Sequence, residues 1–340
     1  MDRRDFIGTS LAATGAMSVA GTATRASAAG KQSVENTPVI LECAINGSVT
    51  KAKNPRSPAT AEEHSEEMIR CFNAGATIIH THSNQPNEDV QKAAQFYMDS
   101  FRPVREQLPH SIFYATANFD PLVIHRTHKS WPGPVQCGHH RILAAAGLAN
   151  MVLQDTGVVP LGAYAKDGLP DPDPAYFFYG FWPDDVRFVN QVCKDFGTGA
   201  SLSVFEPGWM RNVIAMAKGG SLPRGSKLNL YFGSDKFPTM APPIPEALEL
   251  YLKMMEGFDL KWSVGYMGEK SVMDTPLARL ALERGGSFRV GIEDFATGPS
   301  NLDQIQRAKE LIDKVGRHVV TGAEAIEYLD IPFPATRPKA

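Results

Sequence analysis

The stretch Ala76-Thr77-Ile78-Ile79-His80-Thr81-His82 is an apolar run that closes on two histidines separated by one residue. Its composition predicts a buried strand, and side chains two positions apart on a strand project from the same face. The Cα atoms of His80 and His82 would then lie roughly 7 Å apart, so both imidazoles can reach one cation. A pair of hydrogen-bonded core imidazoles is the alternative to a metal site.

A third ligand is expected from the far end of the chain. The apolar run over residues 287–292 ends in two adjacent carboxylates, Glu293 and Asp294. Two histidines and one carboxylate are typical of catalytic zinc sites, which keep a coordination position open, whereas structural zinc is usually closed by four ligands. The pattern therefore predicts a catalytic cation that polarises a carbonyl group.

Short apolar runs alternate with amphipathic segments along the chain, which indicates alternating strands and helices. Strands are expected over residues 39–45, 77–82, 112–117, 151–153, 201–204, 228–232, 260–266 and 288–292. Helices are expected near residues 61–73, 88–107, 140–147, 184–196, 207–218, 246–256, 275–284 and 301–315. This order predicts a (β/α)8 TIM barrel, in which the ends of the second and eighth strands lie on either side of the first.

Three long segments follow predicted strands, at residues 118–138, 156–183 and 233–244. In a TIM barrel such segments surround the catalytic mouth, so a lid is one interpretation of them. A subunit interface is the other, because exposed aromatic residues also mark contact surfaces. The aromatic residues of the second segment are Tyr164, Phe177, Phe178, Tyr179, Phe181 and Trp182.

Residues 1–28 have the features of an export signal. Arg3 and Arg4 precede a stretch rich in Ala, Gly, Ser and Thr, and Ala26-Ser27-Ala28 offers a small-residue cleavage site. The segment resembles a twin-arginine signal, with a disordered tail or a retained anchor as the alternative. We therefore expect a periplasmic protein whose single barrel domain spans residues 29–340.

Charge and cysteine usage exclude several classes of protein. Loss of the signal changes the formal charge from −3 to about −4, which gives no support for nucleic-acid binding. No later stretch approaches the roughly 20 apolar residues of a membrane span.

The scattered cysteines are expected to be core residues, and four histidines outside the motif are expected to face solvent. These are Cys43, Cys71, Cys137 and Cys193, and His125, His128, His139 and His140.

Several ordered motifs resemble the family of β-keto acid cleavage enzymes, which includes 3-keto-5-aminohexanoate cleavage enzyme. Besides residues 74–82, these motifs lie at residues 44–47, 54–63, 262–268, 285–294, 300–301 and 321–325. The resemblance covers nearly all of the mature chain and implies a zinc-containing (β/α)8 barrel that is usually tetrameric. It also implies a reaction in which a β-keto acid and acetyl-CoA give acetoacetate and a new acyl-CoA.

The resemblance also implies roles for single residues. It implies His80, His82 and Glu293 as Zn²⁺ ligands, and Asp294 as the general base that forms an enolate before retro-Claisen cleavage. Arg289 matches the catalytic arginine, although a structural ion pair with Asp294 is the plain alternative. Further candidates for contacts with the substrate are Thr116, Asn118, Thr156 and Ser263.

Four positions depart from the pattern of the family. Asn84 stands where an arginine is usual, and Val49 stands where an acid that binds an amine is expected. Ser201 and Ser203 stand where acidic residues are common. These differences predict a substrate without an amino group.

Export and the use of acetyl-CoA conflict, because acetyl-CoA is a cytoplasmic metabolite. Two further functions therefore stay open: a CoA-independent lyase or hydrolase of a β-dicarbonyl compound, and an exported barrel that binds a metal or an oxo acid without turnover. The joint presence of His80, His82, Arg289, Glu293 and Asp294 favours an enzyme.

Overall fold

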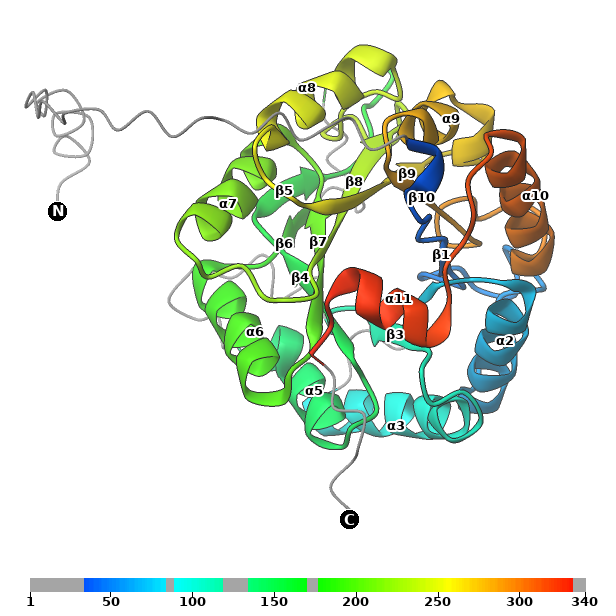
Figure 1. Cartoon of the computed structure of the whole chain (residues 1–340), viewed down its shortest axis with the longest axis vertical. Coiled ribbons are helices and arrows are strands. Elements are labelled where there is room, and N and C mark those ends of the chain that lie inside the picture. Colours follow the sequence, from blue (N-terminus) through cyan, green and yellow to red (C-terminus); the bar gives the residue numbers. More distant parts are fainter. Residues whose placement is uncertain (1–33, 84–88, 119–133, 170–176, 333–340) are drawn as a thin grey trace, which may run out of the picture. The chain divides into compact units, whose positions relative to one another are not determined.

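The computed structural model describes residues 34–83, 89–118, 134–169 and 177–332, which all belong to one compact unit (Figure 1). A ring of helices surrounds the strands in this unit. The predicted signal, Asn84, His125 and His128 lie outside the described residues.

Eight strands form one sheet in the order β3-β2-β1-β10-β9-β8-β7-β4, and its ladders are parallel. The expected TIM barrel is therefore confirmed, and so is the placing of the first strand between the second and the last. The strands of the sheet are β1 (Glu42–Ala44), β2 (Ile78–Thr81), β3 (Ile112–Ala115), β4 (Met151–Asp155), β7 (Gly199–Val204), β8 (Lys227–Gly233), β9 (Lys261–Met267) and β10 (Ser287–Val290).

The seam between β3 and β4 is joined by a side chain. Asn150, which is fully buried, immediately precedes β4. Its Nδ2 donates to the carbonyl of Ser111 at 2.9 Å, and its Oδ1 accepts from the amide of Phe113 at 3.4 Å. The amide side chain thus satisfies backbone groups at the start of β3 and ties the two strands together.

The helices between the strands follow the expected pattern. Thr60 and Glu63 form the capping box of the first of them, and Gly75 ends it with φ 108°. The helices are α2 (Ala61–Ala74), α3 (Val90–Gln107), α5 (Pro134–Ala145), α6 (Pro183–Phe196), α7 (Pro207–Lys218), α8 (Pro245–Met255), α9 (Pro276–Glu283), α10 (Asn301–Lys314) and α11 (Gly322–Leu329), with short 3-10 turns η1 (Val34–Asn36) and η3 (Val272–Asp274).

Helix α11, which the sequence pattern did not predict, covers the end of the barrel at which the strands begin (Figure 1). Its preceding residues pair with the chain that leads into β1, through a parallel bridge between Val39 and Val319. The hydroxyl of Thr77, just before β2, donates to the carbonyl of Val320 at 2.6 Å. With this end covered, the opposite end of the barrel is the one available for a site.

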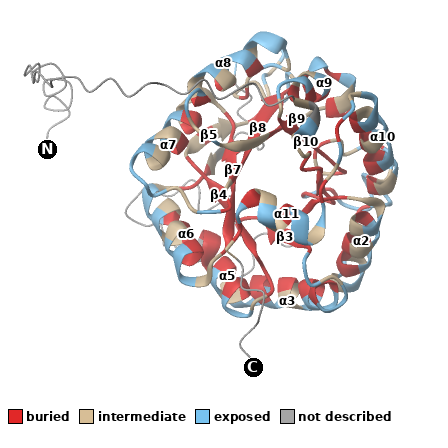
Figure 2. Ribbon diagram, in the orientation of Figure 1, coloured by how far each residue is buried: buried red, intermediate tan, exposed pale blue. Residues whose placement is uncertain are grey.

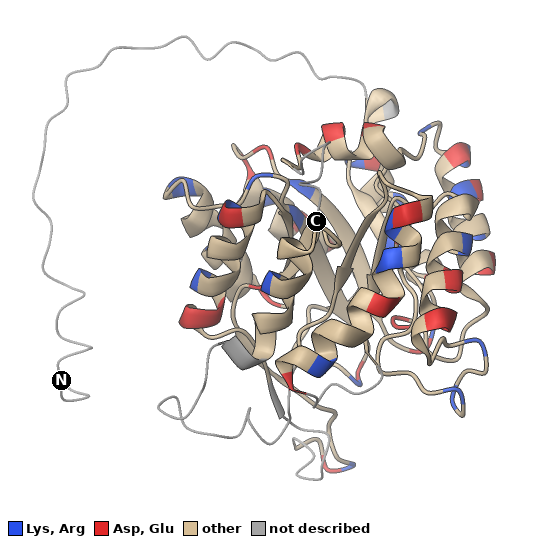
Figure 3. Ribbon diagram, turned by 90° about the horizontal axis from the view of Figure 1, so that it is seen from below, with Lys and Arg blue, Asp and Glu red and all other residues tan. Residues whose placement is uncertain are grey.

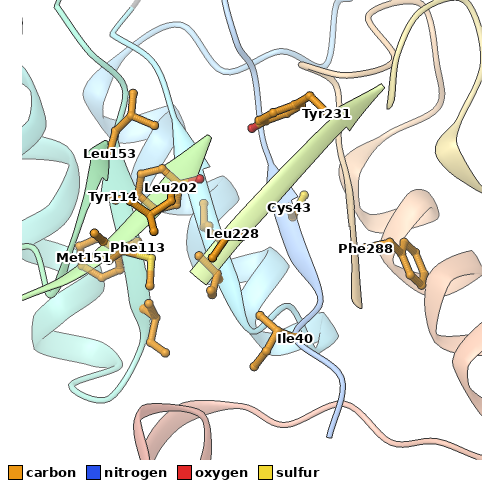
Figure 4. Close-up of a cluster of buried hydrophobic side chains, with 14 of the residues drawn as sticks. Ile40, Cys43, Phe113, Tyr114, Met151, Leu153, Leu202, Leu228, Tyr231 and Phe288 are labelled. Atoms are coloured by element: carbon orange, nitrogen blue, oxygen red, sulfur yellow. The ribbon is translucent and has the colours of Figure 1, made fainter. Parts of the chain in front are cut away.

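Buried residues line the strands and the inward faces of the helices (Figure 2), and charged residues lie mostly on the outer helices (Figure 3). Figure 4 shows part of the buried hydrophobic core, which includes Phe113, Met151 and Leu228. All four cysteines are buried and free, which confirms their expected place in the core. The described residues include no helix long and apolar enough to cross a membrane.

Two of the expectations were wrong. Residues 156–183 are not a loop throughout, because β5 (Val158–Leu161) and β6 (Phe177–Gly180) pair as an antiparallel hairpin. His139 and His140 do not face solvent, because α5 begins earlier than expected and both are fully buried on it. His139 stays in the interior because its Nε2 lies 2.8 Å from the carbonyl of Thr116, which satisfies that ring nitrogen.

Candidate metal centre and its cavity

Three predicted ligands meet at the carboxyl ends of β2 and β10. The Nε2 atoms of His80 and His82 lie 3.0 Å apart. Glu293 Oε2 lies 3.4 Å from the first and 3.3 Å from the second. Among the described residues, these three form the one cluster of His, Cys, Asp and Glu side chains close enough together to hold a metal ion.

The triangle of ligand atoms fits a tetrahedral cation. Bonds of about 2.0–2.1 Å to such an ion set the ligand atoms roughly 3.3 Å apart. Glu293 Oε2 is buried without a hydrogen-bond donor among the described residues, and a cation would satisfy it. Burial lowers the pKa of His80 to about 3, so this imidazole is neutral, which is the form that binds metals.

Asn46, at the end of β1, fixes the second histidine. Its Nδ2 donates to the carbonyl of His82 at 3.0 Å, and its Oδ1 accepts from the amide of His82 at 3.0 Å. The hydroxyl of Thr81 donates to the same Oδ1 at 3.2 Å and lies 2.7 Å from Nδ1 of His64. The backbone that carries the ligand is therefore held by a buried amide.

Replacing Asn46 with alanine should weaken the apparent affinity for Zn²⁺ by about 10- to 100-fold, because outer partners orient metal ligands. Chelator competition on the purified protein measures this change. The Asn190→Ala variant is the matched control, since Asn190 accepts a hydrogen bond from Gln154 at 2.7 Å on the outer side of the barrel. An unchanged zinc affinity in Asn46→Ala would contradict the role.

Arg289 on β10 holds both neighbouring carboxylates from below. Its Nε and Nη2 donate to Asp294 at 2.9 and 2.7 Å, and Nη2 also lies 2.7 Å from Glu293 Oε1. Burial works to raise the pKa of Glu293, but Arg289, His82 and His80 together outweigh burial and hold this pKa well below its usual value. Burial dominates at Asp294 and raises its pKa to about 6.

Beneath Arg289 lies a buried polar network that no sequence motif indicated. Glu42 on β1 accepts from Lys227 Nζ, from Tyr114 Oη at 2.7 Å and from Arg289 Nη1 at 3.4 Å. Lys227 also donates to Asn229 Oδ1 at 2.6 Å. Burial works to raise the pKa of Glu42, yet the charges of Lys227 and Arg289 lower it to about 2, so Glu42 is ionised inside the barrel.

A cavity of about 420 Å³ opens above the ligands. His80, His82, Glu293 and Asp294 line one side of it. Arg289 is not among the lining residues and is 1 % exposed, so its guanidinium reaches the cavity only through the carboxylates that it holds. The arrangement can bind a cation and offer a carboxylate to a molecule bound beside it.

The other predicted substrate contacts are placed differently from one another. Thr116 lines the cavity, whereas Asn118 is buried beside α5, where its backbone N–H donates to the carbonyl of Gln136 at 2.8 Å. The hydroxyl of Thr156 lies 3.2 Å from the carbonyls of Ser203 and Trp209. The hydroxyl of Ser263 donates to Asn229 at 2.6 Å, within the network below the site.

Three of the departures from the family's pattern lie in or beneath the cavity. Val49 and Ser203 line it, and Ser201 accepts a hydrogen bond from Asn229 at 3.0 Å below it. None of these side chains brings a charge to the site, and a substrate without an amino group stays a prediction.

Asp155, at the end of β4, is a second buried acid that lies beside the hydroxyls of Ser203 and Tyr179. Burial raises its pKa to about 6, and those two hydroxyls only partly oppose the shift. Cys137 and Tyr179, two titratable groups that interact with Asp155, remain neutral because burial raises the pKa of each well above its usual value. Asp155 therefore becomes a buried, poorly compensated charge as the pH rises.

The Asp155→Asn variant should gain stability relative to the wild type as the pH rises. The wild type loses stability from this group between its unfolded pKa of 3.8 and its folded pKa of about 6, and the variant does not. The two free energies of unfolding should therefore diverge by about 3 kcal/mol between pH 4 and pH 8. Urea unfolding at both pH values measures this, and a difference that is independent of pH would refute it.

Comparison with known proteins adds sequence relatives to this geometry. A family model described as beta-keto acid cleavage enzyme matches residues 38–331. The 3-oxoadipate:acetyl-CoA acetyltransferase of Cupriavidus necator is 23% identical over 304 residues, covering 87% of this chain and 95% of that protein. The 3-keto-5-aminohexanoate cleavage enzyme of Fusobacterium nucleatum is 23% identical over 301 residues, covering 86% and 98%.

A solved structure is similar in fold. The apo structure of ObcA superposes with a TM-score of 0.59 at 16% sequence identity. The match covers 82% of this chain and 66% of ObcA, so this chain spans just under two thirds of that protein. This likeness supports the barrel fold.

Proposed function

The chain belongs to the β-keto acid cleavage enzyme family, and on that premise we propose that it transfers an acyl group from a β-keto acid to acetyl-CoA. The bond between the keto carbon and the methylene carbon breaks. The methylene fragment takes the acetyl group and leaves as acetoacetate, while CoA takes the acyl group. The observation that carries this proposal is the convergence of His80, His82, Glu293 and Asp294 on one cavity.

The residues of the site divide the work between binding and proton transfer. His80, His82 and Glu293 would hold a divalent cation, which when bound supplies polarisation of the carbonyl oxygens of the keto acid. Asp294 lines the same cavity and accepts the proton lost from the carbon between the two carbonyl groups. Arg289 is a positioning residue, because its donors are directed at Asp294, Glu293 and Glu42.

Three further features belong to the proposal. We propose Zn²⁺ as the cation, since two imidazoles and one carboxylate are its usual catalytic ligands. We also propose a homotetramer, as the family resemblance implies, and periplasmic export directed by residues 1–28. Metal analysis, light scattering and cell fractionation test these three features.

A product assay tests the reaction. The protein without residues 1–28 is incubated with a panel of β-keto acids, with and without acetyl-CoA, and products are identified by mass spectrometry. Acetoacetate and a new thioester that form only with acetyl-CoA and bound metal are expected, and the His80→Ala variant should form neither.

Two other results would replace the proposal. Loss of the keto acid without acetyl-CoA would establish a CoA-independent lyase or hydrolase, the function that export to the periplasm would favour. Saturable binding of the panel without any product would establish a binding protein.

A further inference from the structure

The side of the cavity that faces the metal ligands across the barrel is mostly apolar. The ligands come from β2 and β10, which flank β1, and in the closed ring of strands β4, β7 and β8 lie opposite β1. One cavity-lining residue on that side is polar, Ser203 of β7. Five others come from β4, from β8, from the end of β7 and from the β5–β6 hairpin. We call them the apolar wall: Leu153, Leu161, Tyr179, Phe205 and Tyr231.

Aromatic rings make the wall continuous. Phe205 stacks on Tyr231 with ring centroids 4.7 Å apart and planes at 10°, and it meets the edge of Tyr179 at 5.5 Å. Phe205 is also braced from behind by Trp209 at 5.0 Å. Phe205, Tyr231 and Leu153 are each 4 % exposed, and Figure 4 shows the last two within the core cluster. A surface fixed in this way binds apolar groups without rearrangement.

Charged groups among the described lining residues lie elsewhere. Apart from the metal ligands and Asp294, they are Lys53, Lys236 and Glu269 at the exposed rim, where the last two pair at 2.9 Å. Asp155 is buried beside Tyr179 and does not line the cavity. A charged substituent against the wall would therefore lose water and gain no counter-charge.

We infer that the acyl group transferred by this protein carries an uncharged alkyl or aryl substituent, which packs on the apolar wall. This inference rests on the proposed function, because that function places the keto acid between the metal ligands and the wall. Each added methylene that the wall buries should raise kcat/KM by about fourfold until the wall is filled. A charged substituent of similar size should lower kcat/KM by about 100-fold or more.

The test compares straight-chain 3-oxo acids from 3-oxopentanoate to 3-oxooctanoate with 3-oxoadipate and 3-keto-5-aminohexanoate, using zinc-loaded protein and acetyl-CoA. A rise along the alkyl series and weak use of the two charged acids are expected. Equal or better use of either charged acid would overturn the inference. If 3-keto-5-aminohexanoate is the preferred substrate and Asp155→Asn abolishes that preference, Asp155 and not the wall selects the substrate.

A charge placed in the wall provides the matched variants. Leu161 is half-buried on β5 and has no part in the catalytic machinery. Leu161→Asp should lower kcat/KM for 3-oxohexanoate and raise it for 3-keto-5-aminohexanoate, whereas Leu161→Asn has nearly the same shape without the charge. Identical substrate preference in the two variants would contradict a wall that contacts the substituent.

A binding measurement separates failure of this inference from failure of the proposed function. Titration calorimetry of zinc-loaded protein with 3-hydroxyhexanoate and with 3-hydroxyadipate needs no turnover. Tighter binding of the alkyl acid without thioester formation would support selection by the apolar wall and contradict the proposed reaction. Thioester formation with no preference between the two acids would support the proposed reaction and contradict selection by the apolar wall.

Discussion

The Asp294→Asn variant should lose about 10²- to 10⁴-fold in kcat, the usual contribution of a general base. Asp294 is the one carboxylate of the described cavity lining that lies beside the metal ligands without belonging to the ligand cluster. Arg289 holds it through two hydrogen bonds, so its orientation is fixed before substrate binds. Asparagine keeps the volume and one acceptor oxygen but cannot take a proton at neutral pH.

The defect should lie in proton removal and not in metal binding. Without acetyl-CoA, the wild type should exchange the methylene protons of a β-keto acid with D₂O faster than buffer does, and the variant should not. Zinc content measured in parallel should stay the same. Asp155→Asn is the matched control, because it removes a buried acid whose pKa is also raised to about 6 but which does not line the cavity. Exchange retained in Asp294→Asn would assign the base elsewhere.

The barrel could be predicted because its signals are local. Apolar runs such as residues 228–232 are buried on both faces, and amphipathic segments such as residues 301–315 repeat at helical spacing. The β5–β6 hairpin escaped prediction because residues 156–183 are rich in Pro, Gly and Asp, which indicate loops. Its strands become visible only when Val159 and Tyr179 are paired across the intervening segment.

The ligand triangle could be predicted for a similar reason. Period-two spacing places His80 and His82 on one face, and barrel topology brings Glu293 beside them. The structure shows these three residues together, and the roles of Asp294 and Arg289 stay predictions that the variants test.

What could not be predicted depends on contacts across the barrel. Asn46 is an ordinary polar residue in the sequence, and its hold on His82 follows from the pairing of β1 with β2. From the sequence, Glu42 and Lys227 look like surface charges, but in the closed sheet both are buried and form an ion pair. The periodicity of one strand does not show which residue of another strand will neutralise a buried charge.

The Lys227→Met variant should lower the free energy of unfolding by about 3–5 kcal/mol, because it leaves a buried carboxylate without its nearest counter-charge. Glu42 and Lys227 are both 0 % exposed, and Glu42 would retain the more distant Arg289 at 3.4 Å. Methionine fills a similar volume, so cavity formation contributes little. Urea unfolding at pH 7 measures the change.

Removing both charges should restore much of this loss. In the Glu42→Gln/Lys227→Met double variant no carboxylate remains to be neutralised, and the amide oxygen of the introduced glutamine can still accept from Tyr114 and Arg289. The double variant should therefore be more stable than Lys227→Met alone, whereas independent contributions would make it less stable. A simple sum of the two single effects would show that the pair is not coupled. Restored stability with lowered kcat would show that the network also holds Arg289 in place for Asp294.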